Sequence, residues 1–128
     1  MKFFFDNNLS KHLSDGLGDF GEDTCHLQDY FPEDTIDEVW LKYIGEQGWF
    51  LITIDRQILR RPLEKEALKK YKIGAFFLSG KNMMRWNYVK QLIISWEKIK
   101  SIAHNETPPF AYQVNRHGTK VEKISLDK

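Results

Sequence analysis

The chain has 128 residues, of which 41% are hydrophobic and 14% aromatic, so it is long and apolar enough for one domain with a buried core and is not intrinsically disordered. Its formal net charge of +1 hides an asymmetry: residues 1–48 hold three basic and eleven acidic residues, whereas residues 49–128 hold sixteen basic and seven acidic ones. Such a split is expected where a cation site adjoins a surface for polyanions, or where two solvated faces simply differ in charge. The lone cysteine, Cys25, excludes an internal disulfide and favours the reducing cytoplasm, and no apolar run approaches the ~20 residues of a membrane span.

The first third of the chain predicts two short strands with a helix between them. Residues 2–5 form an apolar run that ends at Asp6, as in a buried strand, and residues 24–27 predict a second strand. Asn7 and Asn8 are suited to cap the intervening helix. Its apolar positions are Leu9, Leu13 and Leu17, and the glycines expected to end it are Gly16, Gly18 and Gly21.

A second helix is predicted to start at Thr35, because Thr35 and Glu38 have the spacing of a capping box. Its apolar face at helical spacing comprises Ile36, Val39, Trp40, Tyr43 and Ile44. Gly48 ends this helix, and residues 49–54 form a third apolar strand that runs directly into Asp55.

The rest of the chain predicts two more helices, a fourth strand and a hairpin. Pro62 suits the first position of a helix that continues to residue 71, and residues 73–78 form the fourth strand. A long helix follows at about residues 83–103, with an apolar stripe of Val89, Leu92, Ile93, Trp96 and Ala103. Residues 110–114 and 119–124 flank a turn and predict a β-hairpin.

This alternation of strands and helices predicts an α/β fold with a central, mainly parallel sheet. We expect one domain over residues 1–128, made of an α/β core at 1–80, the long helix at 81–105 and the C-terminal hairpin at 106–128.

Acidic residues follow two of the predicted parallel strands. Because the carboxyl ends of parallel strands meet at one edge of the sheet, Asp6 and Asp55 are expected to converge there. The helix that begins near Asp37 and Glu38 runs back along the sheet, so its first turn lies at the same edge. Carboxylate oxygens in such a group would suit a hard divalent cation and hence phosphate chemistry.

Each acid also has an ordinary structural explanation. Asp37 and Glu38 complement the dipole of their helix, Asp6 suits a turn, and Asp55 could pair with a neighbouring arginine. The joint placement of the acids after two strands and at one helix start favours the functional interpretation. The arginines that follow, at positions 56, 60 and 61, are suited to hold phosphates.

The segments that carry these acids resemble PIN-like domains, which are metal-dependent ribonuclease folds and include VapC-type toxins of toxin–antitoxin pairs. The resemblance lies in Phe4-Phe5-Asp6-Asn7-Asn8-Leu9, Asp37-Glu38-Val39-Trp40, Leu51-Ile52-Thr53-Ile54-Asp55-Arg56 and Pro62-Leu63-Glu64-Lys65-Glu66-Ala67-Leu68. Residues 75–78 and the hairpin at 110–124 also resemble a compact branch of this family. The resemblance implies a three-layer PIN-like fold and hydrolysis of RNA phosphodiester bonds with Mg²⁺ or Mn²⁺.

Carried over residue by residue, the resemblance implies that Asp6, Asp37 and Asp55 are catalytic and hold the metal, with Glu64 as a fourth acid. Around them it implies a rim of supporting and substrate-binding residues, namely Asn8, Glu38, Thr53, Arg56, Arg60 and Arg61. It also implies a cytoplasmic protein with RNA as substrate, an antitoxin as partner and a possible homodimer.

Gln57 departs from the family pattern, in which a second aspartate often stands two positions after the strand-end acid. A catalytically inactive PIN-like module that binds a protein is therefore the alternative. A phosphoacceptor receiver domain, with Lys81 after a late strand, ranks last because such domains pair two acids after their first strand, where this chain has Asp6-Asn7-Asn8.

Three other groups of residues invite a functional interpretation. Cys25 and His26 are adjacent on a strand and so point to opposite faces, which argues against a nucleophile and base pair. Trp86 and Tyr88 lie off the apolar stripe of the long helix and are candidates for contact with a partner protein or RNA, whereas Trp96 belongs to the core. The hairpin adds basic residues, Arg116, His117, Lys120 and Lys123, which are either part of a basic surface or a solvated edge.

Overall fold

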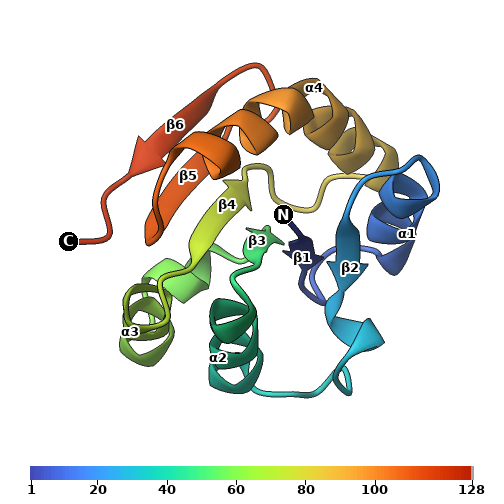
Figure 1. Ribbon diagram of the computed structural model, residues 1–128. Coiled ribbons are helices and arrows are strands. Elements are labelled where there is room, and N and C mark those ends of the chain that lie inside the picture. Colours follow the sequence, from blue (N-terminus) through green and yellow to red (C-terminus); the bar gives the residue numbers. More distant parts are fainter. Residues whose placement is uncertain (128) are drawn as a thin grey trace.

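A computed structural model describes residues 1–127. Its centre is a six-stranded sheet with the strand order β2-β1-β3-β4-β5-β6, in which only β6 is antiparallel to its neighbour (Figure 1). The strands are β1 (Phe3–Phe5), β2 (Thr24–His26), β3 (Phe50–Thr53), β4 (Gly74–Leu78), β5 (Phe110–Val114) and β6 (Val121–Ile124). The expected mainly parallel α/β sheet with a terminal hairpin is confirmed.

Four helices and two 3₁₀ turns connect the strands. The helices are α1 (Lys11–Asp19), α2 (Asp37–Gln47), α3 (Pro62–Lys70) and the long α4 (Arg85–Asn105). The 3₁₀ turns are η1 (Leu27–Asp29) and η2 (Arg56–Leu59). Helices α1 and α4 cover one face of the sheet and α2 and α3 cover the other, which gives the expected three layers (Figure 1).

The three phenylalanines of β1 show how one short strand joins both layers of the core. Phe3 and Phe5 pack in the core beneath α1 and α4, while Phe4 points to the opposite face and stacks on Trp40 of α2. Because β1 is covered on both faces, all three side chains are buried and the strand has no polar alternation.

The start of α1 differs from the prediction. Ser10, rather than Asn7 or Asn8, is the N-cap, and its hydroxyl oxygen accepts a hydrogen bond from the His12 N–H at 3.2 Å. Two of the expected helix-ending glycines, at positions 16 and 18, lie inside the helix, which continues to Asp19. Gly21 follows the end with φ of 97°, so one of the three glycines has the expected role.

The capping box predicted for α2 is wrong. The helix starts at Asp37 after Ile36, which makes no side-chain cap, and the Thr35 hydroxyl donates instead to the carbonyl of Pro32. The buried face is Trp40, Leu41 and Ile44, whereas Ile36 and Val39 are exposed. The sequence pattern missed Leu41 because both faces of this helix carry apolar residues.

The strand and helix ends otherwise fall close to the predictions. Strand β2 ends at His26, because the chain turns into η1 at Leu27. Helix α3 has Pro62 at its first turn, as expected. Helix α4 buries Leu92, Trp96 and Ala103 as predicted, together with Ile99, but Ile93 lies outside the buried stripe and is 59% exposed. In residues 1–127, no helix combines the length and apolar character that a membrane crossing requires.

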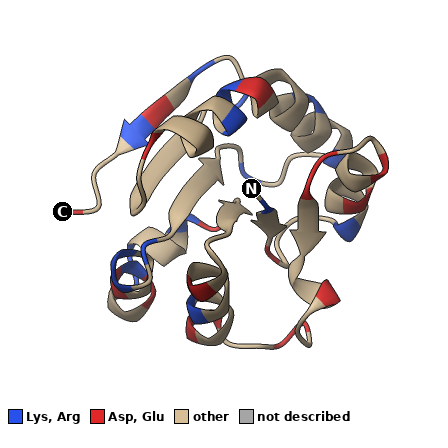
Figure 2. Ribbon diagram, viewed as in Figure 1, with Lys and Arg blue, Asp and Glu red and all other residues tan. Residues whose placement is uncertain are grey.

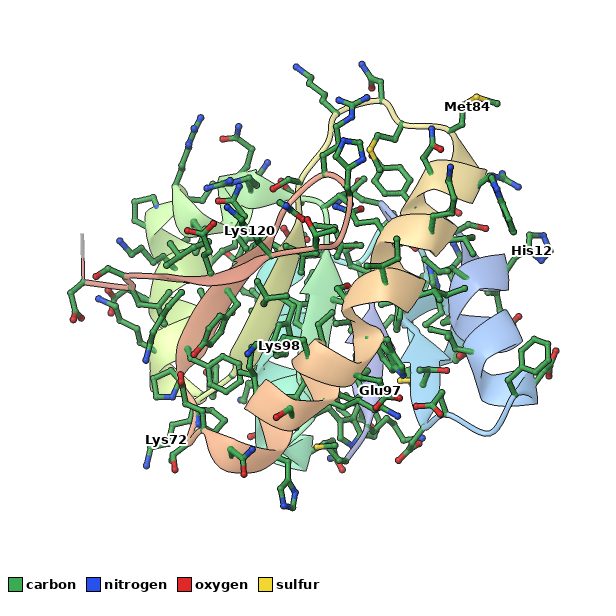
Figure 3. All side chains as sticks on the ribbon, turned by 90° about the horizontal axis from the view of Figure 1, so that it is seen from above. His12, Lys72, Met84, Glu97, Lys98 and Lys120 are labelled. Carbon is green, nitrogen blue, oxygen red and sulfur yellow. The ribbon has the colours of Figure 1, made fainter. Side chains whose placement is uncertain are left out.

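One edge of the sheet collects the segments that carry the candidate site. The parallel strands β1, β3, β4 and β5 end there, and the loops that leave them begin there. This edge, which we call the carboxyl edge, lies toward the top of Figure 3. The same edge holds the start of α2, the start of α4 and the turn between β5 and β6, as the connections require.

Candidate functional site at the carboxyl edge

Four acids predicted from the sequence meet at the carboxyl edge and are called here the acidic site: Asp6, Asp37, Asp55 and Glu64. Asp6 follows β1, Asp55 follows β3, and Asp37 opens α2. Glu64 lies in the first turn of α3. Four segments of the chain therefore bring carboxylates together, three of them predicted from the strand ends and the helix start, and Glu64 expected from the family resemblance.

Asp6 is the most buried of these acids, with 2% of its surface exposed. One carboxylate oxygen accepts the hydroxyl hydrogen bond of Thr53, and the other accepts the Asn8 N–H at 3.2 Å. The Thr53 hydroxyl oxygen in turn accepts the N–H of Asp55 at 2.9 Å. Thr53 thus links the two strand-end aspartates and fixes the direction of the Asp6 side chain.

Burial dominates the electrostatics of Asp6 and raises its pKa to about 7. The two hydrogen bonds oppose this shift, while the nearby carboxylates of Asp55 and Asp37 add to it. Burial also raises the pKa of Asp37 and of Glu64. In all three carboxyl groups, burial disfavours the charged form.

Arg61 is the residue at the centre of the acidic site. Its Nη1 atom lies 3.3 Å from Asp37, 3.5 Å from Asp55 and 3.5 Å from Glu64, measured to one carboxylate oxygen of each. One guanidinium nitrogen therefore contacts acids from three segments. In this structure the Arg61 side chain pairs with the acids, and its expected role in holding substrate phosphates stays a prediction.

The acids are consequently arranged around an arginine. Within the described part of the chain, no group of three or more Asp, Glu, His or Cys side chains is placed so that it could hold a metal ion. The Oε2 atom of Glu64 is buried and makes no hydrogen bond within residues 1–127, although it lies 3.5 Å from Arg61. Arg61 compensates the acid charge but leaves this oxygen without a hydrogen bond.

The remaining residues of the predicted rim fall into two groups. Asn8 supports Asp6 through its backbone, and Glu38 is half-buried beside Asp37. Arg56 and Arg60 are exposed and form no ion pair among residues 1–127, so they stay candidates for substrate contact. Gln57 is exposed next to Asp55 and donates its N–H to the Asp55 carboxylate at 3.0 Å.

The structure gives Cys25 and His26 structural roles. Burial raises the pKa of the Cys25 thiol to about 12, so the thiolate is strongly disfavoured. His26 is fully buried; its Nε2 lies 2.8 Å from the Leu9 carbonyl and its Nδ1 accepts the Gln28 N–H. The rejection of this pair as nucleophile and base agrees with the geometry.

The aromatic residues of α4 differ in burial and in their contacts. Trp96 is buried and donates from its indole nitrogen to Glu22 at 2.7 Å, as a core residue with one polar contact. The Tyr88 hydroxyl donates to the carbonyl of Gly80 at 3.0 Å and ties α4 to the loop after β4. Trp86 is 65% exposed and is the aromatic residue of the three that is open to a ligand.

The sequence pattern did not reveal the central place of Arg61. The available signal was its spacing from Glu64, because residues three apart on a helical turn face each other. Its contacts with Asp37 and Asp55 depend on how α2 and η2 approach each other in space. Figure 2 shows red segments on α1, η1 and α2, of which α2 carries Asp37, the acid nearest to Arg61.

The chain was compared with protein families, curated proteins and solved structures. A family model described as a PIN like domain matches residues 1–80. No curated protein and no solved structure matches the chain. The matched residues include all four acids of the acidic site, Arg61 and the strands β1 to β4. The match covers more than half of the chain, and the chain therefore belongs to the PIN-like domain family.

Proposed function

We propose that this protein is an endoribonuclease that hydrolyses RNA phosphodiester bonds with a divalent cation, Mg²⁺ or Mn²⁺. PIN-like domains are commonly nucleases, and the family match supports this class of activity. The observation that carries the proposal is the convergence of Asp6, Asp37, Asp55 and Glu64 at the carboxyl edge, in the place where α/β folds bind their ligands.

The chemistry of the donor set suits a hard cation. Carboxylate oxygens are the ligands that Mg²⁺ and Mn²⁺ prefer, and burial raises the pKa of Asp6, with a smaller contribution from the neighbouring carboxylates of Asp55 and Asp37. The buried Glu64 oxygen without a hydrogen bond supplies a further free acceptor. Residues Asp6, Asp37, Asp55 and Glu64 would hold the cation once the Arg61 side chain turns away from them.

A bound divalent cation would supply a water of lowered pKa and would neutralise charge that develops on the phosphoryl group. The chain itself supplies the alignment. Thr53 and Asn8 hold the two oxygens of Asp6, so this carboxylate needs little reorganisation during the reaction. Arg61, once released from the acids, and the neighbouring Arg56 would hold the phosphate being cut.

The test is cleavage of a labelled single-stranded RNA with Mg²⁺ or Mn²⁺. The variants Asp6→Asn and Asp55→Asn should each lower the rate by about 100-fold or more, because each removes a ligand charge from the site. Asp34→Asn removes an exposed carboxylate elsewhere and should cleave like wild type. Equal rates in wild type and in both site variants would refute the proposal.

We further propose that the ribonuclease is the toxin of a type II toxin–antitoxin pair, with an antitoxin protein as its partner. The support is the resemblance of the acid-bearing segments to VapC-type toxins. Expression alone should arrest growth of a bacterial host, and expression of Asp55→Asn should not. Normal growth with the active wild-type enzyme would remove the toxin role and leave the ribonuclease activity standing.

A second candidate function is a non-catalytic PIN-like module that binds a protein. Two observations favour it: Gln57 replaces a common family acid, and Arg61 already pairs with three of the four acids. Calorimetric titration with Mn²⁺ separates the two functions. Saturable binding that Asp55→Asn removes supports the enzyme, and the absence of binding supports the module.

A further inference from the structure

The second half of the carboxyl edge carries a group of cations that the acidic site does not use. These are Lys81, Arg85, Lys90, Arg116 and Lys120, called here the basic patch. We propose that the basic patch binds the phosphates of single-stranded RNA beyond the scissile bond. The proposal rests on the ribonuclease function and names the surface along which its substrate runs.

The first observation is that the basic patch has no internal counter-charge. All five side chains are exposed, and none forms an ion pair with an acid in residues 1–127. Between Glu66 and Glu97 the sequence contains no acidic residue at all. Other cations of the chain, such as Lys11, Lys100 and Lys123, do pair with carboxylates. The basic patch is therefore a group of five exposed cations with which no carboxylate of residues 1–127 pairs.

The second observation is that this surface is hollow. A hollow of about 330 Å³ is lined by Lys90, Arg116, His117 and Asn87, with Met83 and Ile94 as its apolar part. Such a surface suits a strand of nucleic acid, because phosphates bind cations and bases stack on apolar or aromatic side chains. The exposed indole of Trp86, next to Arg85, provides a surface on which a base can stack.

The third observation is that the segments bearing the basic patch are fixed to one another. The Gln91 side chain donates from Nε2 to the carbonyl of Ser79 at 2.7 Å and to that of Asn115 at 2.9 Å. Gly118 packs so closely on the α4 backbone that any side chain there would meet the Gln91 carbonyl. The cations after β4, on α4 and after β5 therefore keep their spacing without a ligand, which lowers the entropic cost of binding one.

The fourth observation connects the basic patch to the acidic site. Strand β4 lies between β3 and β5, so the end of β5 is two strand spacings, about 10 Å, from the end of β3. A groove of about 690 Å³ also begins at Asn7 and Asn8, directly after Asp6, and reaches Met83 and Arg85. Met83 lines both the groove and the hollow. The groove and the hollow together connect Asn7 and Asn8, the residues next to Asp6, with Arg85, Lys90 and Arg116 of the basic patch. Figure 3 shows Met84 toward that edge and Lys72 at the opposite end of the sheet.

The charge of the basic patch and its position beside the acidic site indicate which ligand it binds. Five unpaired cations favour a polyanion, and a path that starts at a proposed phosphodiester site favours the strand that is being cut. The cations that border the hollow, Lys90 and Arg116, favour a phosphate-bearing strand over an uncharged partner.

The experiment measures binding of a fluorescein-labelled single-stranded oligouridylate by anisotropy, with a chelator present so that no cleavage occurs. The patch variant is Lys81→Gln/Arg85→Gln/Arg116→Gln. The matched control is Lys42→Gln/Lys72→Gln/Lys98→Gln, which removes three exposed, unpaired cations from other surfaces and leaves the same net charge. Thermal unfolding checks that both variants fold.

The patch variant should bind RNA about 10- to 100-fold more weakly, and the slope of log affinity against log salt should fall in magnitude by about 2, since each phosphate contact contributes about 0.7. The control should retain wild-type affinity and slope. Equal losses in both variants, or wild-type binding by the patch variant, would overturn the proposal. Patch-dependent binding without any cleavage by the metal-loaded protein would uphold the patch and refute the nuclease, so the two failures are distinguishable.

Discussion

The two halves of the carboxyl edge both concentrate charge, but within residues 1–127 the charges of one half are mostly paired and those of the other are not. In the acidic site, four carboxylates from four segments surround Arg61, and one guanidinium nitrogen contacts three of them. In the basic patch, five cations from three segments form no ion pair within residues 1–127. The charge of the acidic site is partly compensated by Arg61, whereas the charge of the basic patch is left for an external ligand to compensate.

This difference indicates that the acidic site binds a cation at short range, whereas the basic patch attracts an anionic ligand from solution. Carboxylates around a buried Asp6 need a cation at short range, because burial weakens solvation of their charge. Exposed lysine and arginine side chains are well solvated, so leaving them without an ion-pair partner costs little free energy. Each of the following experiments changes the charge or the geometry of one half and leaves the other half as its reference.

The largest expected effect comes from removing the buried charge of Asp6. Its pKa is raised from 3.8 to about 7, so the ionised folded protein is penalised above pH 7 and the penalty vanishes below pH 4. In chelator, Asp6→Asn should therefore be more stable than wild type at pH 8, by about 4 kcal/mol at most. Urea denaturation at pH 4, 6 and 8 measures the difference, which should shrink as the pH falls.

The control for this experiment is Asp34→Asn, which alters an exposed carboxylate and should change stability little at each pH. A stability difference for Asp6→Asn that stays constant from pH 4 to pH 8 would show that the Asp6 charge is not penalised by folding.

A smaller loss is expected when the support of the basic patch is disturbed. Gly118→Ala places a methyl group against the Gln91 carbonyl at a φ of 79°, and should cost about 3 kcal/mol through overpacking and backbone strain. Gly48→Ala is the matched control, because Gly48 has a φ of 73° with open space around it, and should cost about 1 kcal/mol. Denaturation of both variants isolates the steric part, and similar losses would mean that the turn moves away from α4 freely.

The smallest expected effect concerns competition for the acidic site. Arg61→Gln removes the resident positive charge, so Mn²⁺ should bind about tenfold more tightly than to wild type, as expected for one nearby charge screened by water. Arg60→Gln is the control, since Arg60 is exposed and unpaired within the described chain. Calorimetry reports both affinities, and loss of Mn²⁺ binding in Arg61→Gln would show that the arginine orders the carboxylates instead of competing with the cation.

The sequence was sufficient to predict most of the fold, because short apolar runs and glycine or proline boundaries are local signals. Strands β1, β3 and β4 and the hairpin lie where the pattern placed them. The errors fall at helix starts and faces, where competing local interactions decide. Thr35 had the spacing of a cap, but its hydroxyl bonds to Pro32, and Ile93 had the spacing of a core residue, but its side of α4 faces outward.

The candidate site was predictable to the extent that it depends on topology. Strand ends in a parallel sheet must share an edge, so the neighbourhood of Asp6 and Asp55 followed from the element order. The position of the Arg61 side chain did not follow, because it depends on the approach of α2 to η2 across residues that are far apart in the sequence. The hollow between α4 and the β5–β6 turn likewise depends on the close contact at Gly118, which no spacing reveals.

Strand β4 is the last strand of the family-matched region and pairs with β5 outside it, and its five residues, Gly74 to Leu78, are all buried. A fragment ending at residue 80 would lose β5 and α4, so the backbone of β4 would become an open sheet edge and Phe76 would lose its cover. Such an edge, apolar and free of charge, is a template for pairing with other chains. We therefore expect the first 80 residues alone to aggregate. In the whole chain, β5 pairs with the edge of β4 and α4 covers its apolar face, which keeps the region that carries the acidic site from aggregating.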